Sequence, residues 1–241
     1  MRMHHQIVTL LEQLQYLLLP PICLLCGAAG EAGRDLCAGC AADLPRNVSA
    51  CTICALPLPA GQAGLCGHCC SHPPPYDRAF APFCYQPPIN FLIRQLKFSA
   101  RLSYARLLSI LFAEALAERG GPWPDCIVPV PLHSMRLRER GFNQALELAR
   151  TAARRLNIPL QAEGLRRIRY TTPQTLLDTH TRQTNPLGAF VLNHSLTGSR
   201  VALIDDVMTT TSTISECARI LRAGGVVNIE VWVLARASSK P

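Results

Sequence analysis

No apolar run in the sequence approaches the roughly 20 residues that a membrane-spanning helix needs. The N-terminal segment is partly apolar, but Glu12, Gln13 and Gln15 interrupt it, and no small-residue cleavage site follows. It therefore does not fit a secretory signal peptide. Its apolar residues recur at helical spacing as far as Pro20-Pro21, so residues 1–20 are predicted to form an amphipathic helix. We expect a cytoplasmic protein without a transmembrane segment.

Two common nucleotide-binding motifs are also missing. The sequence has neither the Walker pattern Gly-x-x-x-x-Gly-Lys nor Gly-x-Gly-x-x-Gly, which counts against a nucleoside triphosphate or a dinucleotide as ligand. No Ser/His/Asp or Cys/His set for nucleophilic catalysis stands out. We interpret His133, His180 and His194 as surface or structural residues rather than general bases.

Acidic residues are scarce in the second part of the chain. Residues 91–241 carry 20 Lys and Arg against 11 Asp and Glu, a net charge of +9, whereas residues 1–90 carry four against five. This surplus indicates a polyanionic ligand such as phosphate or nucleic acid. Arg far outnumbers Lys, however, and a GC-rich coding sequence would produce the same bias. Hydrophobic residues make up 49% of the chain, enough for a folded core.

Cysteine, by contrast, is abundant. Eight of the twelve cysteines stand as four Cys-x-x-Cys pairs, which are Cys23/Cys26, Cys37/Cys40, Cys51/Cys54 and Cys66/Cys69. Each such turn aims two thiolates at one tetrahedral ion, and a second turn completes its coordination. The repeated spacing predicts two structural zinc sites in a double zinc ribbon over residues 21–72. Gly27 and Gly67 suit the tight turns around sulfur.

Disulfides and redox motifs are the alternatives for these pairs. Disulfides would need an oxidising compartment, and a thioredoxin-like motif would not be repeated four times. The second zinc site is the less certain of the two, because His68 and Cys70 lie beside its last pair and could compete as ligands. Cys84, Cys126 and Cys217 lie in apolar contexts and are interpreted as core residues.

Beyond Pro73-Pro74-Pro75, interpreted as a stiff linker, the patterning changes to alternating strands and helices. This order predicts an α/β fold with a doubly wound, mostly parallel sheet over residues 76–241. The expected helices are 101–118, 141–156 and 213–223, and the expected strands are 126–130, 201–204 and 226–234.

Two adjacent acids, Asp205 and Asp206, precede five consecutive hydroxyl residues at the end of one expected strand. Ligands of such sheets bind beyond the carboxyl ends of strands. Thr213 and Glu216 have the spacing of a capping box, which places the hydroxyl run at a helix N-terminus where phosphate binds favourably. The stretch fits a ligand that carries both hydroxyls and phosphates, although an ordinary polar turn would also produce it.

The segment 203–213 resembles the phosphoribosyl-pyrophosphate (PRPP) loop of type I phosphoribosyltransferases. The segments VPVPLHSMRLRERGFNQALELA (128–149) and RRIRYTTPQTLLDTHTRQTNPLGAF (166–190) resemble signature segments of the ComF family (competence protein F, also GntX-like). The cysteine array and Leu96-Lys97-Phe98 fit as well. The resemblance covers nearly the whole chain and implies a type I phosphoribosyltransferase fold behind a zinc ribbon.

The resemblance also implies a set of site residues. Asp205 and Asp206 would bind the ribose hydroxyls near magnesium, Pro131 and Leu132 would lie in the pyrophosphate loop, and Arg182 would act from a lid over 166–190 together with Gln174 and Asn185. The 5′-phosphate would be held by Thr209, Thr210, Thr211, Ser212 and Thr213. No protein nucleophile is needed for such a transfer.

Arg140 is a further predicted ligand of phosphate. Arg136, Arg138 and Arg140 alternate, so they cannot all share one helix face, and the spacing predicts an extended or turning segment. Guanidinium forks suit phosphate oxygens, although a solvated basic face would show the same residues.

Thr211 departs from the family pattern, which usually has Gly at this position. A left-handed backbone would cost Thr about 1–2 kcal/mol, so either the loop is reshaped, with the Thr211 hydroxyl donating to phosphate, or PRPP binding is weakened. We expect PRPP binding with reduced affinity.

Three functions follow from these patterns. The first is a PRPP-binding protein of DNA uptake, natural transformation or use of imported DNA, with phosphoribosyl (pentosyl) transfer to an unidentified acceptor left open. The second is a non-enzymatic adaptor that binds single-stranded DNA and a helicase or another competence protein. The third is a PRPP-sensing regulator.

Overall fold

The structure is a computed structural model, and it describes residues 20–31, 33–99, 101–170 and 186–238. The chain divides into two compact units, Met1–Leu44 and Pro45–Pro241. The predicted N-terminal helix and most of the predicted lid lie outside the described residues. The predicted domain limits of 21–72 and 76–241 stay predictions. No described helix has the length and apolar character that crossing a bilayer requires.

The first unit is built around two cysteine turns. The Cys23 turn closes where Gly27 N–H donates to Cys23 O at 2.9 Å, and Gly27 has a φ of +76°, which glycine adopts without strain. The second turn leads into the short helix α2 (Ala38–Ala42), which begins after Cys37. Backbone hydrogen bonds therefore hold both turns and position the four thiols.

The second unit includes the other two cysteine turns as well as the α/β domain. The turn at Cys51 is followed by α3 (Gly67–Ser71), which begins at Gly67, so this glycine serves as a helix start. The chain before Cys51 pairs with the domain, because Asn47 N–H donates to Pro82 O and Cys84 N–H to Pro45 O. The second ribbon is therefore part of the same compact unit as the sheet.

The sheet of the second unit is entirely parallel, with the order β1 (Arg78–Phe80), β7 (Asn228–Arg236), β6 (Arg200–Met208) and β3 (Cys126–Pro129). The short strand β2 (Phe83–Cys84) extends the pairing of β7. The central strands are apolar runs such as Val201–Ile204 and are buried on both faces, as parallel sheets require. The prediction of a parallel α/β sheet is confirmed.

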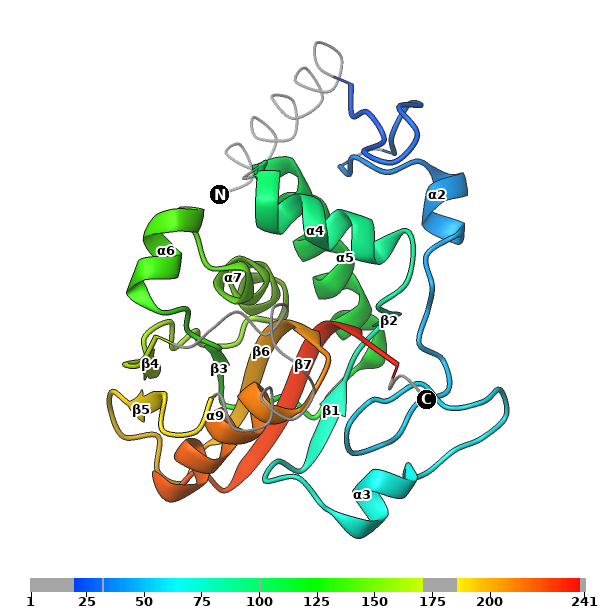
Figure 1. Ribbon diagram of the computed structural model, residues 1–241. Coiled ribbons are helices and arrows are strands. Elements are labelled where there is room, and N and C mark those ends of the chain that lie inside the picture. Colours follow the sequence, from blue (N-terminus) through cyan, green and yellow to red (C-terminus); the bar gives the residue numbers. More distant parts are fainter. Residues whose placement is uncertain (1–19, 32, 100, 171–185, 239–241) are drawn as a thin grey trace, which may run out of the picture. The chain divides into compact units, whose positions relative to one another are not determined.

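Helices cover both faces of this sheet (Figure 1), with α9 (Ser212–Ala223) on one face and α7 (Gln144–Leu156) on the other. The helix α5 (Leu102–Arg119) packs on α7, and α4 (Ile89–Ser99) packs on α5. The remaining described elements are α6 (Ser134–Arg140) and the hairpin of β4 (Leu165–Arg167) with β5 (Phe190–Leu192).

The connections that follow β3 and β6 run in opposite directions across the sheet. After α7 the chain pairs with the outer edge of β3 through the parallel bridge between Leu160 and Ile127. After α9, by contrast, the chain enters β7 on the far side of β6. The carboxyl ends of β3 and β6 therefore meet at a topological switch point, which is where open α/β sheets bind ligands.

Two expected elements differ from the structure. The helix expected over 141–156 begins at Gln144, because Gly141 ends α6 in a left-handed conformation with a φ of +82°. The prediction of an extended or turning segment at Arg136–Arg140 was wrong, since these residues form the helix α6. Arg136 and Arg140 are four residues apart and share one face of that helix, whereas Arg138 does not.

Candidate functional site

Asp205 and Asp206 lie in the last part of β6, inside the strand rather than after it. Asp206 is buried, and its Oδ2 lies 2.5 Å from Nζ of Lys97 on α4. Asp206 N–H donates to Oδ1 of Asp205 at 2.9 Å. The two carboxyl groups are therefore neighbours at the switch point, as the sequence predicts, and a lysine that the sequence reasoning did not single out ion-pairs with one of them.

The pKa of Asp205 is shifted strongly. Burial of the Asp205 carboxyl raises its pKa to about 8, and the neighbouring charge of Asp206 acts in the same direction. The ammonium group of Lys97 and the N–H of Asp206 oppose this shift without cancelling it. Asp205 therefore binds a proton readily in the free protein, and a cation or hydroxyl donors can stabilise its ionised form.

The hydroxyl run connects β6 to α9. Helix α9 begins at Ser212 after Thr211, and Ser212 Oγ donates to Thr210 Oγ1 at 3.2 Å. The predicted position of these hydroxyls at a helix N-terminus is confirmed. Side-chain hydroxyls and the first N–H groups of α9 therefore lie directly beyond the two acids.

The conformation of Thr211 removes one sequence-based expectation. Its φ is −79° and its ψ is −1°, an ordinary right-handed conformation that a β-branched residue adopts without strain. The expected left-handed strain is absent, because the last turn of the loop already has helical geometry. The strain argument for weakened PRPP binding therefore fails.

The predicted capping box was wrong as well. Helix α9 begins after Thr211 rather than after Thr213, and Thr211 makes no side-chain cap. Oε1 of Glu216 accepts from Gly188 N at 2.8 Å, and Oε2 pairs with Arg219. Glu216 therefore ties the segment that precedes β5 to the helix that follows the hydroxyl run.

Arginine side chains converge on the two acids. Arg140, at the end of α6, is half-buried; burial lowers its pKa, and the charges of Asp206 and Arg136 also act on it. Arg136 stacks over Tyr170 with its guanidinium carbon 5.9 Å from the ring centre, and its buried Nη2 has no hydrogen-bond partner among the described residues. The two guanidinium groups therefore lie close enough for their charges to act on each other, and an anion bound beside both would be stabilised.

Arg167 on β4 belongs to the same arrangement. Burial lowers its pKa, and the charges of Arg136 and Asp205 act on it, while its guanidinium carbon lies 5.2 Å from the ring centre of Phe190. The sequence reasoning missed Arg167 and Lys97, although RRIR before the expected lid and Leu96-Lys97-Phe98 were visible signals.

Pro131 and Leu132 follow the end of β3, beside the end of β6. Val130 N–H donates to Ile204 O at 2.8 Å, which fixes the register of the two strand ends. Asn143 then joins this loop to α7, because its Nδ2 donates to Val130 O at 3.0 Å and its Oδ1 accepts from Ala145 N at 3.1 Å. Both predicted loop residues are partly exposed at the site. Arg182, Gln174 and Asn185 lie outside the described residues.

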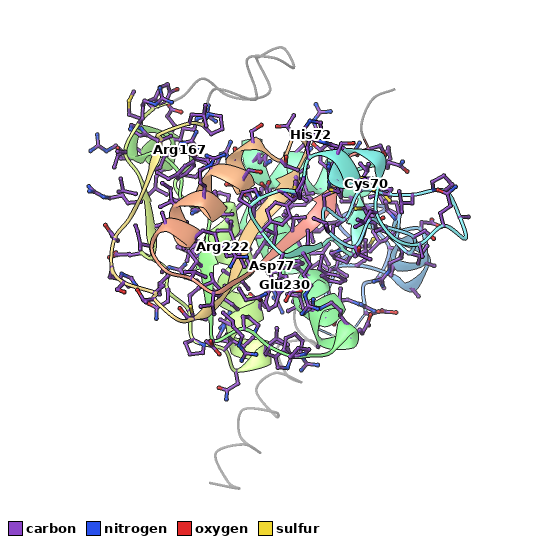
Figure 2. The ribbon with its side chains drawn as sticks, turned by 90° about the horizontal axis from the view of Figure 1, so that it is seen from below. Cys70, His72, Asp77, Arg167, Arg222 and Glu230 are labelled. Carbon is purple, nitrogen blue, oxygen red and sulfur yellow. The ribbon has the colours of Figure 1, made fainter. Side chains whose placement is uncertain are left out.

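Charges at the opposite edge of the sheet are paired instead. Arg222 ion-pairs with Asp77 at 2.5 Å, and Arg119 and Arg78 both pair with buried Glu230. Figure 2 shows Arg222, Asp77 and Glu230 beside one another. Among the described residues, the three arginines of α6 have no such carboxylate partner. The cationic groups at the switch point are therefore the ones that an anionic ligand can reach.

The first cysteine cluster fits a zinc ion. The ligand atoms of Cys23, Cys26, Cys37 and Cys40 lie within 4.8 Å of one another, and the Sγ atoms of Cys26 and Cys37 are 3.6 Å apart. Four sulfurs at about 2.3 Å from one zinc ion would stand about 3.8 Å apart at tetrahedral angles. Burial raises the pKa of Cys23, but N–H groups from Cys37 and Cys26 lower it to about 6, which favours the thiolate.

The second cluster has the same geometry and is more buried. Its members are Cys51, Cys54, Cys66 and Cys69, and the Sγ atoms of Cys54 and Cys66 are 3.7 Å apart. Neither His68 nor Cys70 belongs to it, and both side chains are exposed. The predicted ligand sets of both structural zinc sites are therefore grouped as expected. Cys126 and Cys217 are core residues, while Cys84 is half-buried.

Comparison with known proteins supports both parts of this description. Residues 14–70 match the double zinc ribbon domain, and residues 143–241 match the phosphoribosyl transferase domain. The DNA utilization protein YhgH of Salmonella typhi is 38% identical over 226 residues, 91% of this chain and 99% of that protein. Competence protein F of Haemophilus influenzae is 34% identical over 223 residues, 89% and 96% of the two chains. The chain belongs to the ComF family.

Membership of the ComF family confirms the resemblance that the cysteine array and the three sequence segments indicated. Among solved structures, glutamine PRPP amidotransferase from B. subtilis is 19% identical, covers 52% of this chain and 26% of that chain, and has a TM-score of 0.36. This structural similarity is too weak to support a conclusion about the site of the ComF protein.

Proposed function

We propose that this ComF protein binds PRPP with magnesium at the carboxyl ends of β3 and β6 and serves DNA uptake, natural transformation or the use of imported DNA. The observation that carries the first part is the convergence of two acids, two arginines of α6 and the start of α9 at one switch point. The names of the relatives, DNA utilization protein and competence protein F, support the second part.

The proposed pose follows from the chemistry of each group. Asp205 and Asp206 accept hydrogen bonds from the two ribose hydroxyls, since an ionised carboxylate acts only as an acceptor. The 5′-phosphate lies among the hydroxyls and N–H groups of residues 209–213, at the N-terminus of a 12-residue helix. Lys97 must share or release Asp206 when the sugar arrives, because it holds that carboxylate in the free protein.

The pyrophosphate group lies toward Pro131, Leu132 and α6. Arg140 and Arg136 donate to its oxygens there, and Arg167 approaches from β4. Magnesium bound with PRPP would neutralise part of the charge on departing pyrophosphate. If transfer occurs, the lid predicted over 166–190, with Arg182, excludes water from the oxocarbenium-like sugar.

Calorimetry tests the binding. PRPP with magnesium is titrated into the zinc-loaded wild type and into Arg140→Gln and Arg138→Gln. We expect Arg140→Gln to weaken binding by at least about tenfold, because a charge-assisted hydrogen bond is worth roughly 1.5–3 kcal/mol. Arg138→Gln is the matched control from the same helix and should change affinity less than about twofold. Equal effects of the two variants would mean that PRPP does not use the predicted face of α6.

Turnover separates an enzyme from a sensor. Release of pyrophosphate on addition of an acceptor, lost in Asp205→Asn/Asp206→Asn, would establish phosphoribosyl transfer. Binding that changes the affinity for a protein partner, without release, would establish a PRPP-sensing regulator instead.

One surface favours the second candidate function, binding of single-stranded DNA by a non-enzymatic adaptor. Tyr170 is 44% exposed and lies over His133, with ring centres 5.3 Å apart, and beside Arg136. Ile168 and Arg166, which precede Tyr170 in the chain, are also exposed. Exposed aromatic rings among arginines are the combination that stacks bases and follows a phosphate backbone.

The DNA hypothesis has its own signature. Binding of an oligonucleotide to the adaptor should weaken steeply with salt and should fall at least about fivefold in Tyr170→Ala, since stacking of one base is worth roughly 1–3 kcal/mol. Asp205→Asn/Asp206→Asn should leave it unchanged. DNA affinity that depends on the two acids would assign the oligonucleotide to the PRPP site. A helicase or another competence protein as partner of the ribbon stays a prediction.

The cysteine clusters indicate the cellular compartment in which the protein resides. Every cysteine of the described residues is a free thiol, and eight of them can serve as metal ligands. We place the protein in the cytoplasm because a reducing compartment keeps such thiols available for zinc.

A further inference from the structure

Arg236 joins the second cysteine cluster to the start of the hydroxyl run. It is the last residue of β7 and is 5% exposed. Its Nε donates to Cys54 O at 3.0 Å, while its Nη1 donates to Met208 O at 2.9 Å and to Thr209 O at 2.7 Å. One guanidinium group therefore binds the backbone of a metal ligand and the backbone at the end of β6. Residues 209–213, which follow β6 and carry the hydroxyl run, are called the phosphate loop below.

The charge of Arg236 fits a filled cluster better than an empty one. Within the described ranges no carboxylate forms an ion pair with it, although buried charges are ordinarily paired. A zinc ion with four thiolates carries a net charge of −2, whereas four protonated thiols carry none. Because the guanidinium group hydrogen-bonds Cys54 itself, the filled cluster places compensating negative charge beside a buried cation.

A second connection runs through apolar packing. Ile53 lies between two cysteine ligands and packs against both the cysteine cluster and the core of the α/β domain. That core includes Tyr76 and Met208, and Tyr76 OH lies 4.0 Å from Sδ of Met208. The turn that carries Cys51 and Cys54 is therefore connected to Met208 in two ways. Arg236 binds the backbone of Met208, and the core that contacts Ile53 includes the side chain of Met208.

We propose that Arg236 is a positioning residue that makes the geometry of the phosphate loop depend on metal in the second cysteine cluster, so that zinc there and PRPP at the loop strengthen each other's binding. The second half of this statement rests on the proposed function. By linkage the two effects must be equal, because a coupling free energy acts reciprocally on both ligands. The first cluster, in the unit Met1–Leu44, should take no part.

The first experiment measures zinc release. Zinc-loaded full-length protein is mixed with a chelator that binds zinc but not magnesium, with and without saturating PRPP and magnesium. The Cys26→Ser/Cys40→Ser variant identifies the kinetic phase of the second cluster. We expect PRPP to slow that phase by at least about fivefold, the lower end of ordinary coupling, and to leave the other phase unchanged.

Variants of Arg236 separate positioning from general stability. Arg236→Lys keeps the charge, but a single ammonium group cannot donate to Cys54 and Thr209 in the same fixed geometry. It should abolish the protection of zinc by PRPP while both clusters still fill. The matched control is Arg46→Lys, another cation of the same unit, whose guanidinium carbon lies 5.1 Å from the ring centre of Phe83. Protection that survives in Arg236→Lys would overturn the proposal.

The second experiment does not need PRPP. Hydrogen exchange of the backbone is followed in wild type before and after zinc is removed from the second cluster. Exchange at residues 209–213 should accelerate at least about tenfold, while α7 stays protected. Unchanged exchange at 209–213, or equal acceleration of α7, would overturn the proposal. Failure of PRPP to bind the zinc-loaded protein would overturn the proposed function instead, and the exchange result would still decide the role of Arg236.

Discussion

At the scale of single residues, Lys97 stands out because it holds one of the two acids in the free protein. Its Nζ lies 2.5 Å from Oδ2 of Asp206, and both side chains are largely buried. Removing the lysine leaves a buried carboxylate without its cation, whereas removing an exposed cation from the same helix leaves no buried charge unpaired.

We predict that Lys97→Met lowers the free energy of unfolding by about 1–3 kcal/mol, the usual cost of leaving a buried polar group unsatisfied. Arg94→Met is the matched control, since Arg94 is exposed one turn earlier on α4, and it should change the free energy by less than about 0.5 kcal/mol. Denaturant unfolding of both variants measures the difference. Equal values for the two variants would show that the ion pair of Lys97 with Asp206 does not stabilise the fold.

The raised pKa of Asp205 predicts a pH dependence. At pH 7 a carboxyl with a pKa of about 8 is mostly protonated, and only its ionised form offers both oxygens as acceptors to the ribose hydroxyls. PRPP affinity, measured at fixed free magnesium, should therefore rise as pH increases from 6.5 and level off above about 8. Since the charge of Lys97 lowers the pKa of Asp205, Lys97→Met should move the midpoint to higher pH. A flat profile in wild type would contradict this assignment.

Thr211 gives a third residue-scale prediction. With a φ of −79° the threonine is unstrained, so glycine has no strain to relieve there. We expect Thr211→Gly to leave PRPP affinity in calorimetry within about twofold of wild type. A gain of tenfold or more would show that the bound loop adopts a left-handed conformation at this position after all.

At the scale of elements, the junction of β3 with α7 determines where the pyrophosphate loop lies. Asn143 closes this junction because its amide donates to Val130 O while its carbonyl caps the first turn of α7 at Ala145. The two functions reside on different atoms of one side chain, so two substitutions can separate them.

Asn143→Ala should lower the free energy of unfolding by about 1–2 kcal/mol through loss of the cap. Asn143→Asp keeps the acceptor for Ala145 N but loses the donor to Val130, so it should retain most of the stability and still weaken PRPP binding. Thermal unfolding and calorimetry measure the two quantities. An Asn143→Asp protein with unchanged PRPP affinity would show that the hydrogen bond to Val130 O does not position the loop.

Elements were predicted well where periodicity was strong and poorly where turn chemistry decided. The helix expected over 101–118 is present as Leu102–Arg119, and the strand expected over 226–234 as Asn228–Arg236. Alternating arginines suggested an extended segment, but a short helix formed there because His133 caps its start and Gly141 ends it. Glu216 had the spacing of a capping box, yet the N–H of Gly188, distant in sequence, is its partner.

At the scale of the whole molecule, cysteine spacing predicted both ligand sets but not where the second set belongs. Spacing reports which thiols can meet at one ion, and it carries no information about packing partners. The second ribbon lies in one compact unit with the sheet through contacts such as that of Arg236 with Cys54, which are distant in sequence. The sequence marked the segments that carry Lys97 and Arg167 but not their partners, because those partners lie on other elements.

The distribution of paired and unpaired arginines over the sheet is also a property of the whole molecule. Arginines at the amino ends of the strands are paired with acids, as Arg222 is with Asp77. Arg140 of α6, by contrast, interacts electrostatically with Asp206 without forming an ion pair among the described residues. The net charge of the second part of the chain is therefore less informative than the location of the unpaired cations. That location follows from the topology of the sheet.

A structure of the zinc-loaded protein with PRPP and magnesium tests the proposed binding site most directly. We predict the ribose hydroxyls at Asp205 and Asp206, the 5′-phosphate at residues 209–213, and the pyrophosphate toward Arg140. PRPP bound elsewhere, for example in the open groove that Arg150 and Arg154 line on α7, or no PRPP bound at saturating concentration, would contradict it.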